Sequence, residues 1–150
     1  MLQGHQTWVF ENKPTIIGTA TVVGPLEGQG PLAEDFDIIH EELMMGQDSW
    51  EKAEKVLVEG AGELAIKKAG LTKEDINFYI GGDLLNQIIS NSFAARTLGI
   101  PFIGIFGACS TSMESLALAA LMVNSNSANY ALASASSHNA GAEKQFRYPT

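Results

Sequence analysis

The feature that most constrains the fold is a strand, a tight turn and a helix that follow one another in residues 103–122. Residues 103–106 form a short apolar run of strand length. Gly107 and Ala108 let the chain turn with little side chain to clash. The residues that follow are rich in Ala, Leu and Met, which are strong helix formers. Cys109 is therefore expected at the start of a helix, directly after a strand.

This position makes the turn around Cys109, here called the cysteine turn, a candidate functional site. The first turn of a helix presents unpaired backbone N–H groups and a partial positive charge, which stabilise a bound anion or a thiolate. Ser110 and Thr111 are suited to cap the helix. A buried structural cysteine is the simpler interpretation of Cys109. The strand-to-helix setting and the neighbouring hydroxyl groups favour a functional one.

The helix after the cysteine predicts a layered architecture. From Leu116 to Val123 it has no polar face. A helix that is apolar all round must be covered all round, so we expect a buried central helix with a packed layer on each side.

Charge is distributed unevenly along the 150 residues, which suffice for one ordinary domain. The net charge is −8, which argues against a nucleic-acid partner. Between residues 76 and 142 the charged residues are Asp83, Arg96 and Glu114, so this stretch is expected in a core or under a partner. One cysteine excludes an internal disulfide, and no zinc-type cluster occurs. Without a signal peptide or membrane span, we expect an intracellular protein.

Strands and helices alternate along the chain. Strands are predicted at 8–10, 15–23, 77–82, 102–106 and 130–135, and helices at 31–45, 50–69, 84–98 and 110–123. In the helix at 50–69, Glu51, Glu54, Glu59 and Glu63 are expected on the outer side, and Gly60 and Gly62 indicate close packing. This alternation predicts an α/β fold with right-handed βαβ units and a mainly parallel sheet.

In such sheets ligands bind beyond the carboxyl ends of the strands. Polar groups follow three predicted strands: Asp83 with Asn86, Cys109 with Ser110 and Thr111, and Ser136 with His138 and Asn139. We expect these groups to converge. Asp83 is also interpreted as an N-cap and His138 as a cap or core residue. Arg96 is interpreted as an ion-pair partner of Asp83 or Glu114, the preferred role, or as a ligand anchor.

Several segments carry a family resemblance. They are 6–10 (QTWVF), 82–87 (GDLLNQ), 107–115 (GACSTSMES), 136–140 (SSHNA) and 145–150 (QFRYPT). With these motifs the whole chain closely resembles the stage V sporulation protein AD family. The resemblance implies the thiolase-like fold, two similar halves stacked as αβαβα layers, related to the 3-oxoacyl synthases. Residues 1–150 then correspond to the N-terminal half, expected to be truncated before its last strand, with the second half absent.

The resemblance also implies a function. Members of this family bind dipicolinic acid (pyridine-2,6-dicarboxylate) for its uptake into the forespore, together with membrane proteins of the same sporulation operon. The first hypothesis is therefore a non-catalytic binding protein, peripheral to the inner spore membrane, without a cofactor or resident metal. Its ligand is dipicolinate, free or as a calcium chelate. The candidate contacts are Asp83, Asn86, Cys109, Ser110, Thr111, His138 and Asn139.

Two further hypotheses stay open. In the second, the protein is an acyl-transferring enzyme of the thiolase type, with Cys109 as nucleophile and backbone N–H groups as the oxyanion hole. This enzyme needs a base near the thiol, and His138 is the histidine placed at a strand end. In the third, the uncharged middle docks on its own copy, as a homodimer, or on a membrane assembly.

Overall fold

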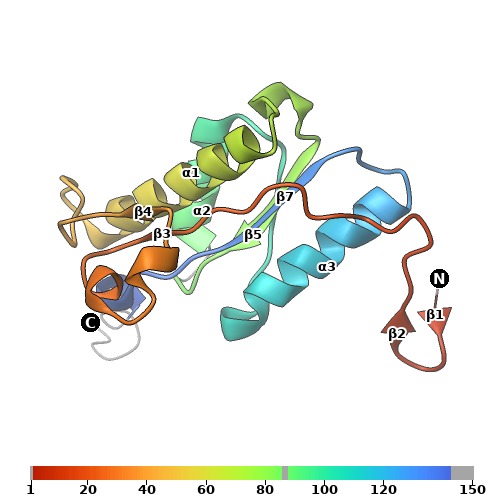
Figure 1. Ribbon diagram of the computed structural model, residues 1–150, viewed down its shortest axis with the longest axis horizontal. Helices are drawn as coiled ribbons and strands as arrows, with labels where there is room; N and C mark the ends of the chain where they lie inside the picture. Colours follow the sequence, from red (N-terminus) through yellow and green to blue (C-terminus); the bar gives the residue numbers. More distant parts are fainter. Residues whose placement is uncertain (1, 86–87, 143–150) are drawn as a thin grey trace.

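A computed structural model describes residues 2–85 and 88–142. Its centre is a sheet of three parallel strands in the order β6–β5–β7. Figure 1 labels β5 and β7 of this sheet. These are β5 (Phe78–Gly82), β6 (Phe102–Gly104) and β7 (Ala131–Ala135). The helices are α1 (Trp50–Lys68), α2 (Ile89–Leu98) and α3 (Thr111–Asn124). The predicted α/β class with a parallel sheet is confirmed.

The helices form layers on the two faces of the sheet. α1 packs on α2 above one face, and α3 lies along β7 and β5 on the other (Figure 1). The chain runs from β5 through α2 to β6, and then from β6 through α3 back across β5 to β7. Because right-handed crossovers in opposite directions put their helices on opposite faces, α2 and α3 must be separated by the sheet.

The core lies between the sheet and the layer of α1 and α2. It consists of Val58, Ile66, Ile76, Tyr79, Ala94, Ala95, Leu98, Ile100 and Leu132. Gly62 allows the close approach of helix and sheet, since a Cβ there would lie 3.3 Å from Leu98 Cδ1 and 3.5 Å from Leu132 Cδ2. The packing expected at Gly62 is thus confirmed. Ser49 caps α1, accepting from the backbone N of Lys52 at 3.3 Å.

The outer side expected for α1 needs one correction. Glu51 and Glu59 are half-buried and Glu63 is exposed, but Glu54 is only 1% exposed. It belongs to the buried stripe that continues through Val58, Gly62 and Ile66, because these positions lie four residues apart and share one face of a helix.

The N-terminal region differs most from expectation. Its elements are β1 (Leu2–Gln3), β2 (Thr7–Trp8), β3 (Val22–Val23), η1 (Glu27–Gln29), η2 (Ala33–Asp35) and β4 (Ile38–Ile39). The predicted helix at 31–45 is wrong. Asp37 accepts hydrogen bonds from the backbone N of Thr21 at 3.0 Å and from Lys68 Nζ at 2.6 Å, which hold this stretch extended beside β3 and α1.

The strand predicted at 15–23 contracts to β3, which pairs in parallel with β4 rather than with the central sheet. The residues before it pack directly on α1, since a Cβ on Gly18 would lie 2.6 Å from the Ala65 carbonyl oxygen. A groove of about 980 Å³ separates this extended segment from β7, and α3 also lines it. Along this side, β7 has no paired strand among the described residues.

Two further boundaries shift. The helix predicted at 84–98 begins at Ile89, after Ile88 with φ +55°. β6 ends at Gly104, although the backbone N of Ile105 still donates to the Gly81 carbonyl at 3.0 Å. The last strand is confirmed within one residue, and the cysteine helix starts one residue late, at Thr111.

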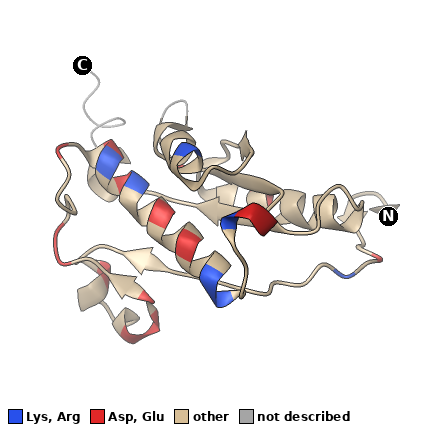
Figure 2. Cartoon of the chain, turned by 90° about the horizontal axis from the view of Figure 1, so that it is seen from above, with Lys and Arg blue, Asp and Glu red and all other residues tan. Residues whose placement is uncertain are grey.

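α3 is covered on one side in the described chain. Ser115 and Ala119 face the sheet and are buried, whereas Met113 is 67% and Leu121 38% exposed. One of the two layers expected around this helix is therefore present here. Charged residues gather instead on α1 and on the loops near it (Figure 2). Within the described ranges, no helix is both long and apolar enough to span a bilayer.

Candidate functional site

The cysteine turn lies at the carboxyl edge of the sheet, between β6 and α3. It is the 3-10 turn η5 (Ala108–Ser110), and Ala108 adopts φ +50° to enter it. The Cys109 side chain is exposed. Among the described residues, the backbone amides of Ala108 and Cys109 donate to no acceptor. An exposed thiol beside free N–H groups is the arrangement expected of an anion-binding turn.

The two hydroxyl groups next to Cys109 do not play the expected capping roles. Ser110 Oγ has one proton, which it donates either to the Gly107 carbonyl, 2.6 Å away, or to Glu114 Oε1. It makes no capping hydrogen bond to the helix. Thr111 is 2% exposed, and its Oγ1 accepts from the backbone N of Gly107 at 3.1 Å. Both hydroxyls therefore hold the turn together, and the carboxylate of Glu114 lies beside it.

Gly82 fixes the distance between β5 and the cysteine turn. A Cβ on this residue would lie 1.9 Å from the Ile105 carbonyl oxygen and 3.2 Å from Thr111 Cγ2. The Ile105 carbonyl oxygen is a backbone atom, so it cannot move aside unless the cysteine turn moves with it. The turn thus rests directly on the end of β5.

Asp83, at the end of β5, is buried at 1% exposure. Its Oδ1 accepts from the backbone N of Leu85 at 3.0 Å, and its Oδ2 accepts from the backbone N of Asn91 at 2.8 Å. Asn91 lies in the first turn of α2, so Asp83 accepts a hydrogen bond from the start of this helix. The N-cap residue is Ile88, however, so the interpretation of Asp83 as the N-cap is wrong. The predicted companion Asn86 lies outside the described residues.

Asn91 is the centre of a buried polar network that the sequence interpretation missed. Its Nδ2 donates to Asp83 Oδ2 at 3.0 Å and to Ser136 Oγ at 2.8 Å. Its Oδ1 accepts from Tyr79 Oη and from Ser134 Oγ, the latter at 3.3 Å. Burial raises the pKa of Tyr79 to about 12, so its hydroxyl remains a donor near neutral pH. The ends of β5, β7 and α2 are joined by this network.

Glu54 completes the network from α1. Ser136 Oγ donates to Glu54 Oε1 at 2.8 Å. Burial raises the pKa of Glu54 from 4.5 to about 7. The hydrogen bond from Ser136 lowers this pKa, and the like charge of Asp83 raises it further. The signal that could have revealed this residue is its position on the apolar stripe of α1.

His138 follows β7 but does not approach the cysteine. Its Nε2 lies 2.9 Å from the Leu43 carbonyl oxygen, and its ring lies 5.0 Å from that of Trp50 on α1. It is 5% exposed, and its Nδ1 has no partner among the described residues. Cys109 lies in η5, just before α3 on the other face of the sheet. The strands that precede Cys109 and His138 are β6 and β7, which lie on either side of β5 and so about 10 Å apart. Asn139, next to His138, is exposed.

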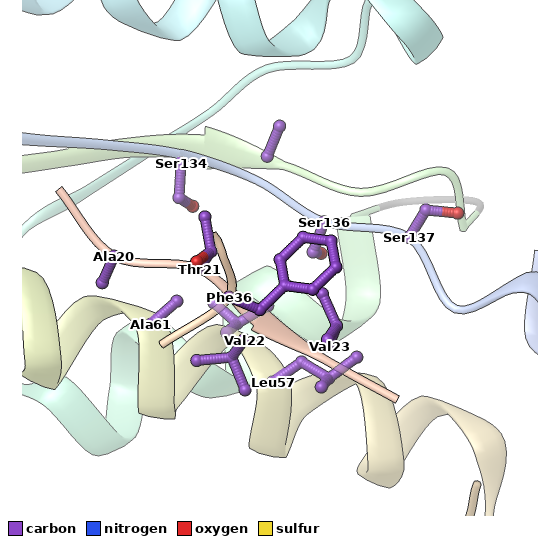
Figure 3. A pocket seen from close by; sticks show the side chains of 12 residues that line it. Ala20, Thr21, Val22, Val23, Phe36, Leu57, Ala61, Ser134, Ser136 and Ser137 are labelled. Atoms are coloured by element: carbon purple, nitrogen blue, oxygen red, sulfur yellow. The ribbon is translucent and has the colours of Figure 1, made fainter. Parts of the chain in front are cut away.

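The segment after β7 also borders a small cavity, of about 250 Å³, between β3, α1 and the end of β7. Figure 3 shows Phe36 between the side chains from α1 and those of Ser134 and Ser136. Two of the residues in the buried network thus also line this cavity.

The remaining charged candidate is not at this edge. Arg96 is exposed in the last turn of α2, which begins at the edge and runs away from it, and no ion pair of the described residues includes it. The ion pair expected with Asp83 or Glu114 is therefore wrong. Within the described ranges, no group of three His, Cys, Asp or Glu side chains could hold a metal ion.

Comparison with known proteins gives the family. The model of the family described as "Stage V sporulation protein AD" matches residues 4–150. The chain belongs to this family. A relative, the stage V sporulation protein AD of Bacillus subtilis (strain 168), is 50% identical over 149 residues, which cover 99% of this chain and 44% of the relative. The chain thus spans less than half of that relative's length, and the family implies a role in sporulation.

A solved structure confirms the predicted fold. The 3-oxoacyl-[acyl-carrier-protein] synthase III of Aquifex aeolicus VF5 matches with a TM-score of 0.53 and 19% identity, over 58% of this chain and 30% of that one. At this identity the likeness concerns the fold alone. The member of the sporulation family described here therefore has part of a thiolase-like fold.

Proposed function

We propose that the protein serves sporulation by binding dipicolinate without catalysis, at the cysteine turn on the carboxyl edge of the sheet. One observation carries this proposal: Cys109 is exposed beside free backbone amides, whereas His138 is buried across the sheet. Donors are thus available to a carboxylate, but this chain brings no histidine base to the thiol.

The buried residues keep a supporting part in this proposal. Asp83, Thr111 and His138 are at most 5% exposed, so they shape the edge rather than meet a ligand in the conformation described. Contact with dipicolinate falls to Cys109 and the neighbouring amides, whereas Asn139 lies beside His138, after the strand on the other side of β5. The carboxylate of Glu114 opposes an anion here. A calcium chelate, in which the metal offsets the ligand's charge, suits this turn better than the free dianion.

Calorimetric titration with dipicolinate, with and without calcium, tests the proposal. We expect saturable binding that weakens several-fold in Cys109→Ala, because an exposed group next to the donors is lost. Pyridine-2,4-dicarboxylate is the matched control ligand, since its two carboxylates cannot both bind the same cation as the ring nitrogen. Absence of saturable binding, in this chain and in the longer B. subtilis relative alike, would reject the proposal.

The second candidate is acyl transfer through Cys109, favoured by the fold shared with a 3-oxoacyl synthase and by the exposed thiol. Incubation with an acyl thioester followed by mass spectrometry distinguishes the two. A stable acyl group on Cys109 would support the enzyme, and an unmodified thiol the binding protein.

We further propose that the exposed apolar side of α3 docks on a second copy, giving a homodimer, and that the assembly works beside membrane proteins of the same operon at the forespore. Met113, Leu116 and Leu121 are the exposed residues of that side. Sedimentation equilibrium tests the dimer, and a monomer at every concentration would contradict it.

A further inference from the structure

Glu54 is a buried acid that joins α1 to the segment following β7. Ser136 Oγ donates to its Oε1 at 2.8 Å, and the backbone amide of His138 also donates to the carboxyl group. At 1% exposure Glu54 is shielded from water. Ser136 and His138 both belong to residues 136–139, here called the β7 turn, and the Ser90 side chain of α2 is a further hydrogen-bond partner of the carboxyl group.

Among the residues that the structure describes, the groups around Glu54 offer no positive charge against it. Asp83 faces it from the end of β5, with a like charge. α2 contributes Ser90 and Asn91, which do not titrate. From the β7 turn, His138 directs its ring to the Leu43 carbonyl and to Trp50.

The two lysines of α1 nearest to Glu54 in the sequence are engaged elsewhere. Lys52 pairs with Asp48 at 2.7 Å, and Lys55 pairs with Glu59 at 3.0 Å. No ion pair of the described residues includes Glu54. If Glu54 were ionised while the β7 turn packs on α1, it would be a buried charge supported by hydrogen bonds alone. Burying such a charge costs free energy.

We propose that Glu54 is a proton-dependent positioning residue for the β7 turn: the acid is protonated while the turn is closed on α1, and it ionises as the turn opens. When the turn opens, water reaches the carboxyl group and it titrates as an ordinary glutamate. When the turn closes, burial favours the neutral form. Closing therefore takes up a proton, so low pH favours the closed turn and high pH the open one.

The pH range of this effect follows from the two states. Burial raises the pKa of Glu54 from 4.5 to about 7 in the closed structure. Between about pH 5 and 7 the equilibrium constant for opening should rise by up to tenfold per pH unit, and outside this range it should be constant. The turn carries the exposed Ser137 and Asn139, so opening moves the polar groups at the carboxyl edge. This inference does not rest on dipicolinate being the ligand.

Native-state hydrogen exchange of the whole chain tests the proposal without any ligand. Two amides report on the turn: Ser136 N donates to the Gly82 carbonyl at 3.1 Å, and Ala142 N donates to the His138 carbonyl at 2.9 Å. After correction for intrinsic exchange rates, their protection should fall 10- to 100-fold between pH 5 and 7. In Glu54→Gln, which mimics the neutral acid, protection should be independent of pH. Protection that does not change with pH in the natural protein would overturn the proposal, and so would an equal change in the variant.

Glu63→Gln, an exposed position on the same helix, is the matched control and should keep the natural pH dependence. Ser136→Ala tests the same link should Glu54→Gln fail to fold. The hydroxyl of Ser136 lowers the pKa of Glu54, so its loss should extend the pH-dependent range upwards. An unchanged range in a folded Ser136→Ala protein would overturn the proposal.

Discussion

The carboxylate of Asp83 accepts two hydrogen bonds from Asn91, one from its backbone N at 2.8 Å and one from its side-chain Nδ2 at 3.0 Å. This double contact sets the orientation of the Asn91 amide, because the reverse orientation would place its oxygen against an ionised carboxylate. Its Oδ1 is thereby directed to Tyr79 and Ser134. One buried acid thus orders a network that spans three elements of the carboxyl edge.

Asp83→Asn should therefore destabilise the protein strongly. The substitution removes the charge that accepts from both nitrogen atoms of Asn91, and leaves buried donors poorly matched. We expect the free energy of unfolding to fall by about 3 kcal/mol in urea titrations near pH 7. Asp35→Asn, an exposed acid in η2, is the control and should change it by less than about 0.5 kcal/mol. Equal stabilities of the two variants would contradict the network described here.

Gly82→Ala tests the contact between β5 and the cysteine turn. The new Cβ would meet the Ile105 carbonyl oxygen at 1.9 Å, so the turn must shift. We expect a loss of about 2 kcal/mol, typical of overpacking, and altered NMR shifts at residues 105–111. Gly24→Ala is the control, since its Cβ would meet only the end of Glu27 at 3.8 Å. Unchanged shifts at the turn would show that Gly82 is not needed there.

The parts of the fold that could be predicted are those where one local signal dominates. The apolar runs of β5, β6 and β7 and the Ala- and Leu-rich α3 determine their own structure. The helix expected at 31–45 failed because hydrogen bonds from distant Thr21 and Lys68 to Asp37 override local helix propensity.

The candidate site was predictable in place but not in role. The strand-to-helix pattern put Cys109 at the carboxyl edge, where it lies. Burial decides the roles of the other candidates, and the residue type of a polar side chain does not predict its burial. His138 is fixed by a carbonyl from the distant Leu43, and Glu54 was assigned to the surface because an acid is rarely buried.

The stability of the protein should depend on pH through Glu54. Its pKa is about 7 in the folded state and near 4.5 when unfolded, so the folded state binds more protons between these values. The free energy of unfolding should therefore fall as pH rises from about 4.5 to 7, by on the order of 3 kcal/mol from this group. Urea titrations at each pH measure the change. In Glu54→Gln this part of the pH dependence should be absent. If the free energy of unfolding of the variant falls with pH as steeply as that of the natural protein, the effect belongs to another group.

Glu114 should limit both the reactivity of Cys109 and anion binding at its turn. Ser110 Oγ can donate to Glu114 Oε1, which holds a negative charge beside the exposed thiol. Glu114→Gln keeps an acceptor for this hydroxyl but removes the charge. We expect alkylation of Cys109 by iodoacetamide to accelerate roughly two- to fivefold at low salt, and less at high salt, because screening weakens exposed charges. Glu74→Gln, at an exposed acid in the 3-10 turn η3 (Lys73–Asp75), should leave the rate unchanged. An equal rate in Glu114→Gln and the natural protein at low salt would show that this carboxylate does not act on the thiol.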